Sequence, residues 1–145
     1  MNLFRRTTLG VAMLAAVTLV ASACSKGSAT ADGTPTTSSP RPSSPAQVTI
    51  LSPANGQVIH GSTVKIRVKL VGAKIVPATT THIVPTEGHL HVYVDNQIAG
   101  MNFKLTDEIG NVAPGMHVLR VEFVASDHLP WDPRIFSQVT LEVKA

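Results

Sequence analysis

Residues 64–70 read VKIRVKL, a strict alternation of apolar and basic side chains. Successive side chains of a β-strand point to opposite faces of its sheet, so the pattern places the apolar groups on one face and the cations on the other. A helix would spread both kinds of side chain around its circumference. The segment therefore predicts a strand with one face on a hydrophobic core.

The same period of two recurs on both sides of this segment. It is seen in residues 89–94 (HLHVYV), 118–124 (VLRVEFV) and 139–144 (VTLEVK), and shorter candidate strands cover 47–51 and 97–102. Turn-forming residues separate these segments, and none shows the apolar stripe of a helix. The pattern predicts an all-β fold, a single antiparallel β-sandwich of about seven strands.

Two segments resemble bacterial immunoglobulin-like domains. Residues 50–58 (ILSPANGQV) look like the first strand and turn of such domains, and residues 114–121 (PGMHVLRV) look like a turn that leads into a late central strand. The resemblance spans nearly all of residues 46–145. It implies an immunoglobulin-like β-sandwich and says almost nothing about function.

The amino-terminal residues have the three-part layout of a secretory signal peptide. A basic start, an apolar run over residues 7–20 and the small residues ASA lead to Cys24, the sole cysteine of the chain. The layout resembles the bacterial lipobox, in which the cysteine receives a diacylglyceryl group, although Ala21 stands where leucine is usual. This resemblance implies a signal peptide over residues 1–23 and a lipid anchor on Cys24. An ordinary signal peptide cleaved before Cys24 is the alternative.

A lipidated Cys24 would place the protein at the cell membrane, anchored on its extracytoplasmic face. The sequence also resembles small uncharacterised lipoproteins of actinobacteria. After Cys24 the chain is rich in Ser, Thr, Gly, Ala and Pro up to residue 45, too polar to offset the entropy of ordering. We therefore expect residues 24–45 to be a disordered tether and residues 46–145 to be the domain.

The charge of the mature chain argues against a nucleic-acid partner. Without Arg5 and Arg6, which lie in the signal segment, ten Lys and Arg residues face nine Asp and Glu residues. A charge this close to neutral gives no reason to expect a nucleic acid or an anionic membrane surface as a partner.

His89 and His91 form a candidate metal site. Residues two apart on a strand project to the same face, with Cβ atoms about 7 Å apart, and imidazole suits zinc and copper. A tight site needs three or four ligands, and the candidates for the third are His82, Met101 and His117. Alternatively, His89 and His91 are polar groups that are solvated or hydrogen-bonded to a neighbouring segment. His117 is in phase with apolar neighbours, which favours a structural hydrogen bond to the backbone.

The segment 127–134 (DHLPWDPR) is a second candidate site, predicted to be a loop between the last two long strands. Asp127, His128, Trp131 and Asp132 would form a recognition loop, because a rigid loop with a tryptophan offers a large contact area. Alternatively, Trp131 folds back and caps the core. The sequence favours neither interpretation.

Motifs for nucleophilic, phosphate-binding or zinc-peptidase catalysis are absent from the sequence. We therefore expect a non-enzymatic binding or structural module on the cell surface, which contacts an envelope protein or glycan and needs no cofactor. The alternative is an envelope copper- or zinc-binding protein that uses the His89/His91 pair.

Overall fold

The computed structural model describes residues 40–145. The predicted signal peptide, Cys24 and the predicted tether up to residue 39 lie outside the described residues. Within residues 40–145, no helix has the length and apolar character needed to cross a membrane.

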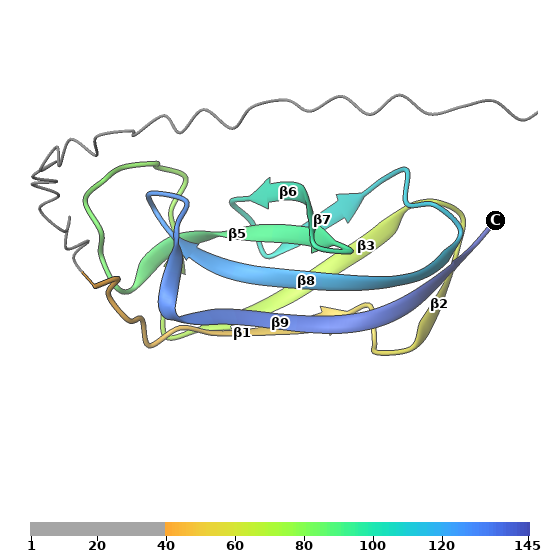
Figure 1. Ribbon diagram of the computed structural model, residues 1–145, viewed down its shortest axis with the longest axis horizontal. Helices are drawn as coiled ribbons and strands as arrows, with labels where there is room; N and C mark the ends of the chain where they lie inside the picture. The colour runs from red at the N-terminus through yellow and green to blue at the C-terminus, as the bar shows by residue number, and fades with distance from the viewer. Residues whose placement is uncertain (1–39) are drawn as a thin grey trace, which may run out of the picture. The chain divides into compact units, whose positions relative to one another are not determined.

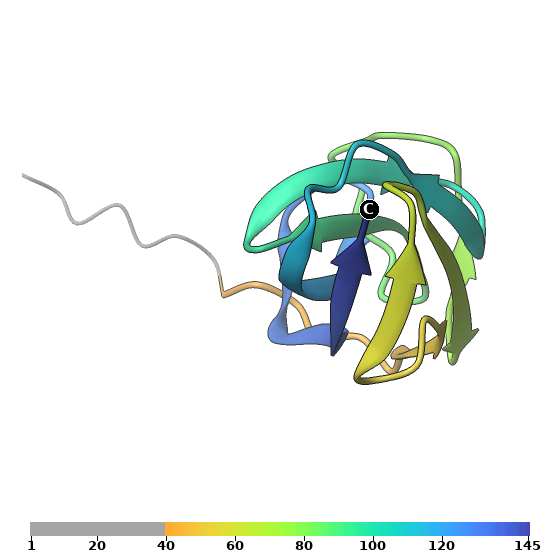
Figure 2. The same cartoon turned by 90° about the vertical axis from the view of Figure 1, so that its right-hand side faces the viewer.

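Residues 40–145 form nine strands in two sheets (Figure 1). One sheet has the order β1-β3-β7, and the other has the order β2-β9-β8-β5-β4 with β6 paired to β5. Seen along the strands, the two sheets face each other around a common core (Figure 2). The strands are β1 (Gln47–Ser52), β2 (Gln57–His60), β3 (Val64–Val71), β4 (Lys74–Ile75), β5 (Glu87–Val94), β6 (Gln97–Asn102), β7 (Thr106–Ile109), β8 (Gly115–Ala125) and β9 (Pro130–Lys144).

The strand order confirms an immunoglobulin-like sandwich. The first strand pairs with β3 in the smaller sheet, and the chain then crosses so that β2 pairs with β9 in the larger one. The larger sheet is built around the antiparallel pairs β5–β8 and β8–β9. Two sheets of this connectivity define the immunoglobulin-like architecture. The pairings are antiparallel except for β2–β9 and β4–β5, which are short and parallel.

The core lies between the sheets and follows the alternation of the strands. Val64, Ile66 and Val68 of β3 are buried, whereas the cations between them are exposed. From the larger sheet, Val121 and Phe123 of β8 are also fully buried. One face of each sheet therefore supplies the hydrophobic core, as the period of two predicts.

The structure corrects the predicted recognition loop. Strand β9 begins at Pro130, so the connection after β8 is a turn at residues 126–129 and not a loop over 127–134. Trp131 is 1% exposed and its ring stacks on Phe123 with a centroid distance of 6.2 Å. Trp131 therefore caps the core, and the interpretation of its side chain as an exposed recognition group is wrong. Asp132 is exposed on the strand that follows.

The structured domain also begins earlier than the composition indicates. The carbonyl of Pro42 accepts a hydrogen bond from the Asp132 amide at 3.2 Å, and Arg41 contacts the β8–β9 turn. Residues 40–45, which were predicted to be tether, run against the sandwich as a strap (Figure 1). These contacts join residues far apart in the sequence, so local composition does not reveal them.

Candidate metal centre

Gly88 sets the start of the candidate site by letting β5 approach β8 closely. A Cβ atom at this position would collide with the carbonyl oxygen of Val124 and with the ring of Phe123. The next residue, His89, is paired with Val124, and His91 is paired with Glu122. Both histidines point away from the core, because Leu90 between them is buried in it.

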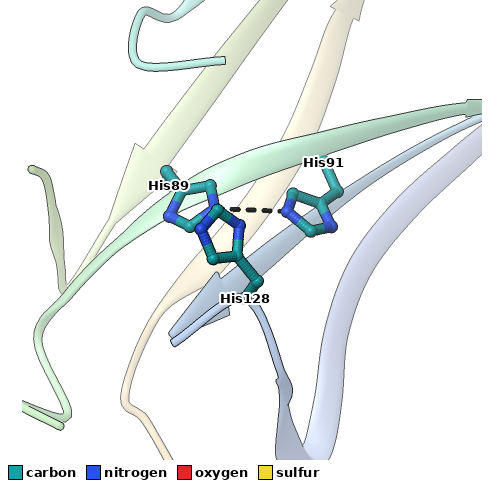
Figure 3. Close-up of side chains that lie close together, drawn as sticks. All are labelled: His89, His91 and His128. Atoms are coloured by element: carbon teal, nitrogen blue, oxygen red, sulfur yellow. Dashed lines mark hydrogen bonds between the residues drawn. The ribbon is translucent and has the colours of Figure 1, made fainter. Parts of the chain in front are cut away.

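Three imidazoles converge beside this part of β5. The Nε2 atom of His89 lies 3.1 Å from Nε2 of His91 and 3.0 Å from Nδ1 of His128. His128 comes from the β8–β9 turn and reaches over the two strand histidines (Figure 3). One potential ligand atom from each residue lies within 4.8 Å of the other two.

His89 and His91 are buried although they lie outside the core, and His128 is half-buried. His89 is 0% exposed and His91 is 6% exposed. The Phe103 ring lies against His89 with a centroid distance of 5.1 Å, and the Tyr93 hydroxyl lies 3.4 Å from Nδ1 of His91. The alternative that these histidines are solvated is therefore wrong, whereas the alternative of a hydrogen bond to a neighbouring segment is observed between His89 and His128.

Hydrogen bonding among the three rings satisfies them only in part. A ring nitrogen of neutral imidazole either donates one proton or offers one lone pair, so Nε2 of His89 can bond to one of its two neighbours at a time. Nδ1 of His89 is buried without a hydrogen-bond partner among the described residues. A cation at the centre would instead accept a lone pair from each of the three rings.

Burial favours the neutral form of His89 and His91, which is the form that binds metal ions. Desolvation, together with the neighbouring His91 and His128, lowers the pKa of His89 to about 4. Desolvation and the neighbouring His128 also lower the pKa of His91, while Glu122 acts in the opposite direction. Protons therefore compete less with a metal ion for the nitrogen atoms of His89 and His91.

The carboxylate opposite His91 is already paired. Glu122 is fully buried, and its two oxygen atoms accept hydrogen bonds of 2.6 Å from Nε and Nη2 of Arg134. This bidentate ion pair compensates the buried negative charge of Glu122. Among the His, Cys, Asp and Glu side chains of the described residues, the potential ligands that converge here are the three imidazoles.

The structure brings His128 to the His89/His91 pair, and neither His117 nor His82 belongs to this histidine cluster. His117 lies near the other end of β8, about 26 Å from Ala125 at 3.3 Å per residue, where it bonds to Asp95 and to the Ala113 carbonyl. The bond to Ala113 is the structural role that the sequence favours. The imidazole of His82 is exposed and outside the cluster.

Met101 was placed correctly beside the pair, whereas His128 was not expected there. Met101 is paired with His91 across the β5–β6 hairpin, as the sequence predicts, and is 54% exposed. His128 was assigned to a recognition loop. The strand pairing explains why His128 lies near His89. Because β5 and β8 are antiparallel, the end of β8 lies beside the start of β5, and the turn that carries His128 follows the end of β8.

Asp127 also has a defined role. Its carboxylate accepts hydrogen bonds from Arg41, which lowers the pKa of Asp127 below its ordinary value. The side chain is therefore engaged within the domain and holds the strap to the β8–β9 turn.

No family model and no curated protein matches the chain. Solved structures with a similar arrangement include the fibronectin(III)-like modules of CbhA from Clostridium thermocellum, with 22% identity over 68% of this chain and 96% of that one, at a TM-score of 0.48. The endo-beta-1,4-mannanase from Thermotoga petrophila matches with 12% identity over 68% of this chain and 20% of its own, at a TM-score of 0.45. The PKD domain of human KIAA0319 matches with 16% identity over 74% of this chain and 88% of its own, at a TM-score of 0.41. Likeness at this level says nothing about what the chain binds.

Proposed function

We propose that the domain is a binding module for one zinc or copper ion, held by Nε2 of His89, Nε2 of His91 and Nδ1 of His128. The observation that supports the proposal is the convergence of two buried imidazoles and one half-buried imidazole, with nitrogen separations of 3.0 and 3.1 Å. Two nitrogen atoms bound about 2.0–2.1 Å from one ion, at an angle of about 90–110°, lie about 2.8–3.4 Å apart. Both separations fit this range.

The ligand set favours zinc or copper over harder cations. Neutral imidazole suits zinc and copper, whereas magnesium and calcium prefer oxygen ligands. Three protein ligands leave a further coordination position, which water or a group from a partner can occupy. The proposed role is to bind or pass on a metal ion, and the expectation that the protein is not an enzyme stays a prediction.

The proposal includes the location of the site. We infer from residues 1–24 that Cys24 is lipidated and that the domain stands on the extracytoplasmic face of the cell membrane. The expected contact with an envelope protein or glycan also stays a prediction. Trp131 does not serve such a contact, because it is buried in the core.

Metal titration of the chain without its signal segment tests the site. We expect isothermal titration calorimetry with Zn²⁺ and with Cu²⁺ to show one ion per chain for at least one of them. His128→Ala should lower the affinity at least tenfold, because it removes one of three ligands from a turn outside the core. His82→Ala is the matched control and should leave the affinity unchanged, because its imidazole is exposed and outside the cluster. Absence of binding at micromolar metal would refute the proposal.

A further inference from the structure

We propose that Arg41 is a positioning residue for the third metal ligand, so that the strap of residues 40–45 completes the histidine site. The inference rests on the proposed function, since it concerns the same site. The third ligand, His128, lies on the β8–β9 turn, and Arg41 holds this turn in place.

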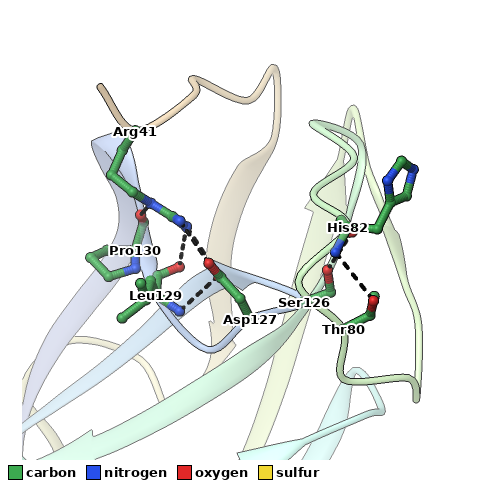
Figure 4. A network of polar contacts seen from close by, with 7 residues as sticks. All are labelled: Arg41, Thr80, His82, Ser126, Asp127, Leu129 and Pro130. Carbon is green, nitrogen blue, oxygen red and sulfur yellow. Dashed lines mark hydrogen bonds and ion pairs between the residues drawn. The ribbon is translucent and has the colours of Figure 1, made fainter. Parts of the chain in front are cut away.

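Arg41 contacts the residues on both sides of His128 (Figure 4). Its Nη1 and Nη2 atoms donate to the two carboxylate oxygens of Asp127 at 2.7 and 3.1 Å. The same guanidinium donates from Nε to the Pro130 carbonyl at 3.0 Å and from Nη2 to the Leu129 carbonyl at 3.3 Å. One side chain therefore fixes three of the four residues from 127 to 130, and the fourth is the proposed ligand.

The turn needs support because its backbone is unusual at the ligand itself. His128 has a φ of 67°, in the left-handed region that residues with a Cβ atom seldom adopt. Within the turn, the His128 amide donates to the Ala125 carbonyl at 3.0 Å, and the Leu129 amide donates to Asp127 at 3.1 Å. The Asp127 carboxylate that stabilises this conformation is the group that Arg41 holds.

A second segment holds the turn at its start. The Ser126 hydroxyl donates to the His82 carbonyl at 3.2 Å, and the Thr80 amide donates to the Ser126 carbonyl at 3.1 Å (Figure 4). The backbone before His128 is thus tied to the β4–β5 connection. Asp127, Leu129 and Pro130 are bonded to Arg41. Loss of Arg41 therefore removes the contacts that hold this part of the turn, which the β4–β5 connection does not contact.

Small displacements of this turn matter because metal coordination tolerates only about 0.2 Å of error in each bond. His89 and His91 are fixed by a central strand of the larger sheet, whereas His128 depends on the turn. Arg41 is therefore expected to act on metal affinity through His128 alone. Because coupling between two sites is reciprocal, a bound ion should in turn favour docking of the strap.

A double-mutant cycle tests this role in the chain without its signal segment. We expect Arg41→Ala to lower the affinity for Zn²⁺ or Cu²⁺ about tenfold. Arg41→Lys should lower it less, because lysine keeps the positive charge but cannot donate two parallel hydrogen bonds to the Asp127 carboxylate. In the His128→Ala background, Arg41→Ala should cause no further loss. Lys74→Ala is the matched control, because it removes another ion pair, Lys74–Glu87, that does not touch the turn.

The Cu²⁺ electron paramagnetic resonance spectrum supplies a readout that a merely structural role would not move. The spectrum of Arg41→Ala should shift towards that of His128→Ala, as one nitrogen ligand is lost. Asp127→Asn, which weakens the same contact from the other side, should have the same effect. The proposed role of Arg41 would be overturned by an unchanged spectrum and affinity in Arg41→Ala. It would also be overturned if Arg41→Ala lowered the affinity equally in the unaltered chain and in His128→Ala. Neither result would contradict the metal site itself. Absence of metal binding by the unaltered chain would overturn the proposed site as well.

Discussion

His117 and Asp95 form an ion pair at the end of the sandwich opposite the histidine cluster. Nδ1 of His117 lies 2.6 Å from the Asp95 carboxylate. This contact, together with the Ala113 carbonyl, raises the pKa of His117 above 6.5. Hydrogen bonds from the Val118 amide and from His117 lower the pKa of Asp95 below 3.8.

These two shifts predict a window of pH in which the pair stabilises the fold. A raised histidine pKa contributes stability that is complete below the unfolded value of 6.5 and is lost as the pH rises through the folded value. A lowered aspartate pKa contributes stability that is present above 3.8 and is lost as the pH falls through the folded value. The free energy of unfolding in urea should therefore differ more between the unaltered chain and His117→Gln at about pH 5.5 than at about pH 8.5. A difference that does not change with pH would contradict this.

At the scale of single residues, local pattern predicted part of the candidate site. The period of two places His89 and His91 on one face of a strand, and that geometry is observed (Figure 3). The same reasoning left open whether both are solvated or bonded to a neighbouring segment. They are not solvated, because the Phe103 and His128 rings pack against His89, and His89 lies within hydrogen-bond distance of His128.

At the scale of secondary-structure elements, strands with a clear alternation were predicted, whereas β4, β7 and the first part of β9 were not. Strands β3, β5 and β8 carry the apolar and polar alternation that predicts them. Strand β7 reads TDEI and β4 has two residues, so neither has a pattern to detect. Such strands form because a neighbouring strand offers its backbone hydrogen bonds, which is a property of the sheet and not of the segment.

The approach of β5 to β8 gives a prediction at this scale. Gly88→Ala should lower the free energy of unfolding by about 1–3 kcal/mol, because the added methyl group meets the backbone of Val124 and the Phe123 ring, which cannot both move away. Gly100→Ala on β6 is the matched control, since the nearest atom to an added Cβ there is 3.5 Å away, an ordinary contact. Urea unfolding followed by circular dichroism measures both. Equal effects of the two substitutions would show that the β5–β8 approach is not tight.

At the scale of the whole molecule, the proposed anchor gives a prediction about location. We expect the unaltered chain to sediment with membranes of a bacterium that expresses it, and to incorporate a labelled fatty acid. Cys24→Ser should abolish the label, because a hydroxyl at this position does not accept the diacylglyceryl group as a thioether. A label retained in Cys24→Ser, or its absence from the unaltered chain, would refute lipidation of Cys24.

The sandwich, its buried faces and the shared orientation of His89 and His91 were predictable, because each depends on side chains a few positions apart on one strand. The third imidazole and the contact of Arg41 with Asp127 were not, and capping of the core by Trp131 was one of two interpretations that the sequence left open. His89 and His128 are 39 residues apart, and Arg41 and Asp127 are 86 residues apart. Such contacts exist only once β5 has paired with β8 and the strap lies against the turn. Strand pairing between distant segments leaves no periodic pattern in the sequence. For this reason only the tertiary structure shows that the three histidines lie together.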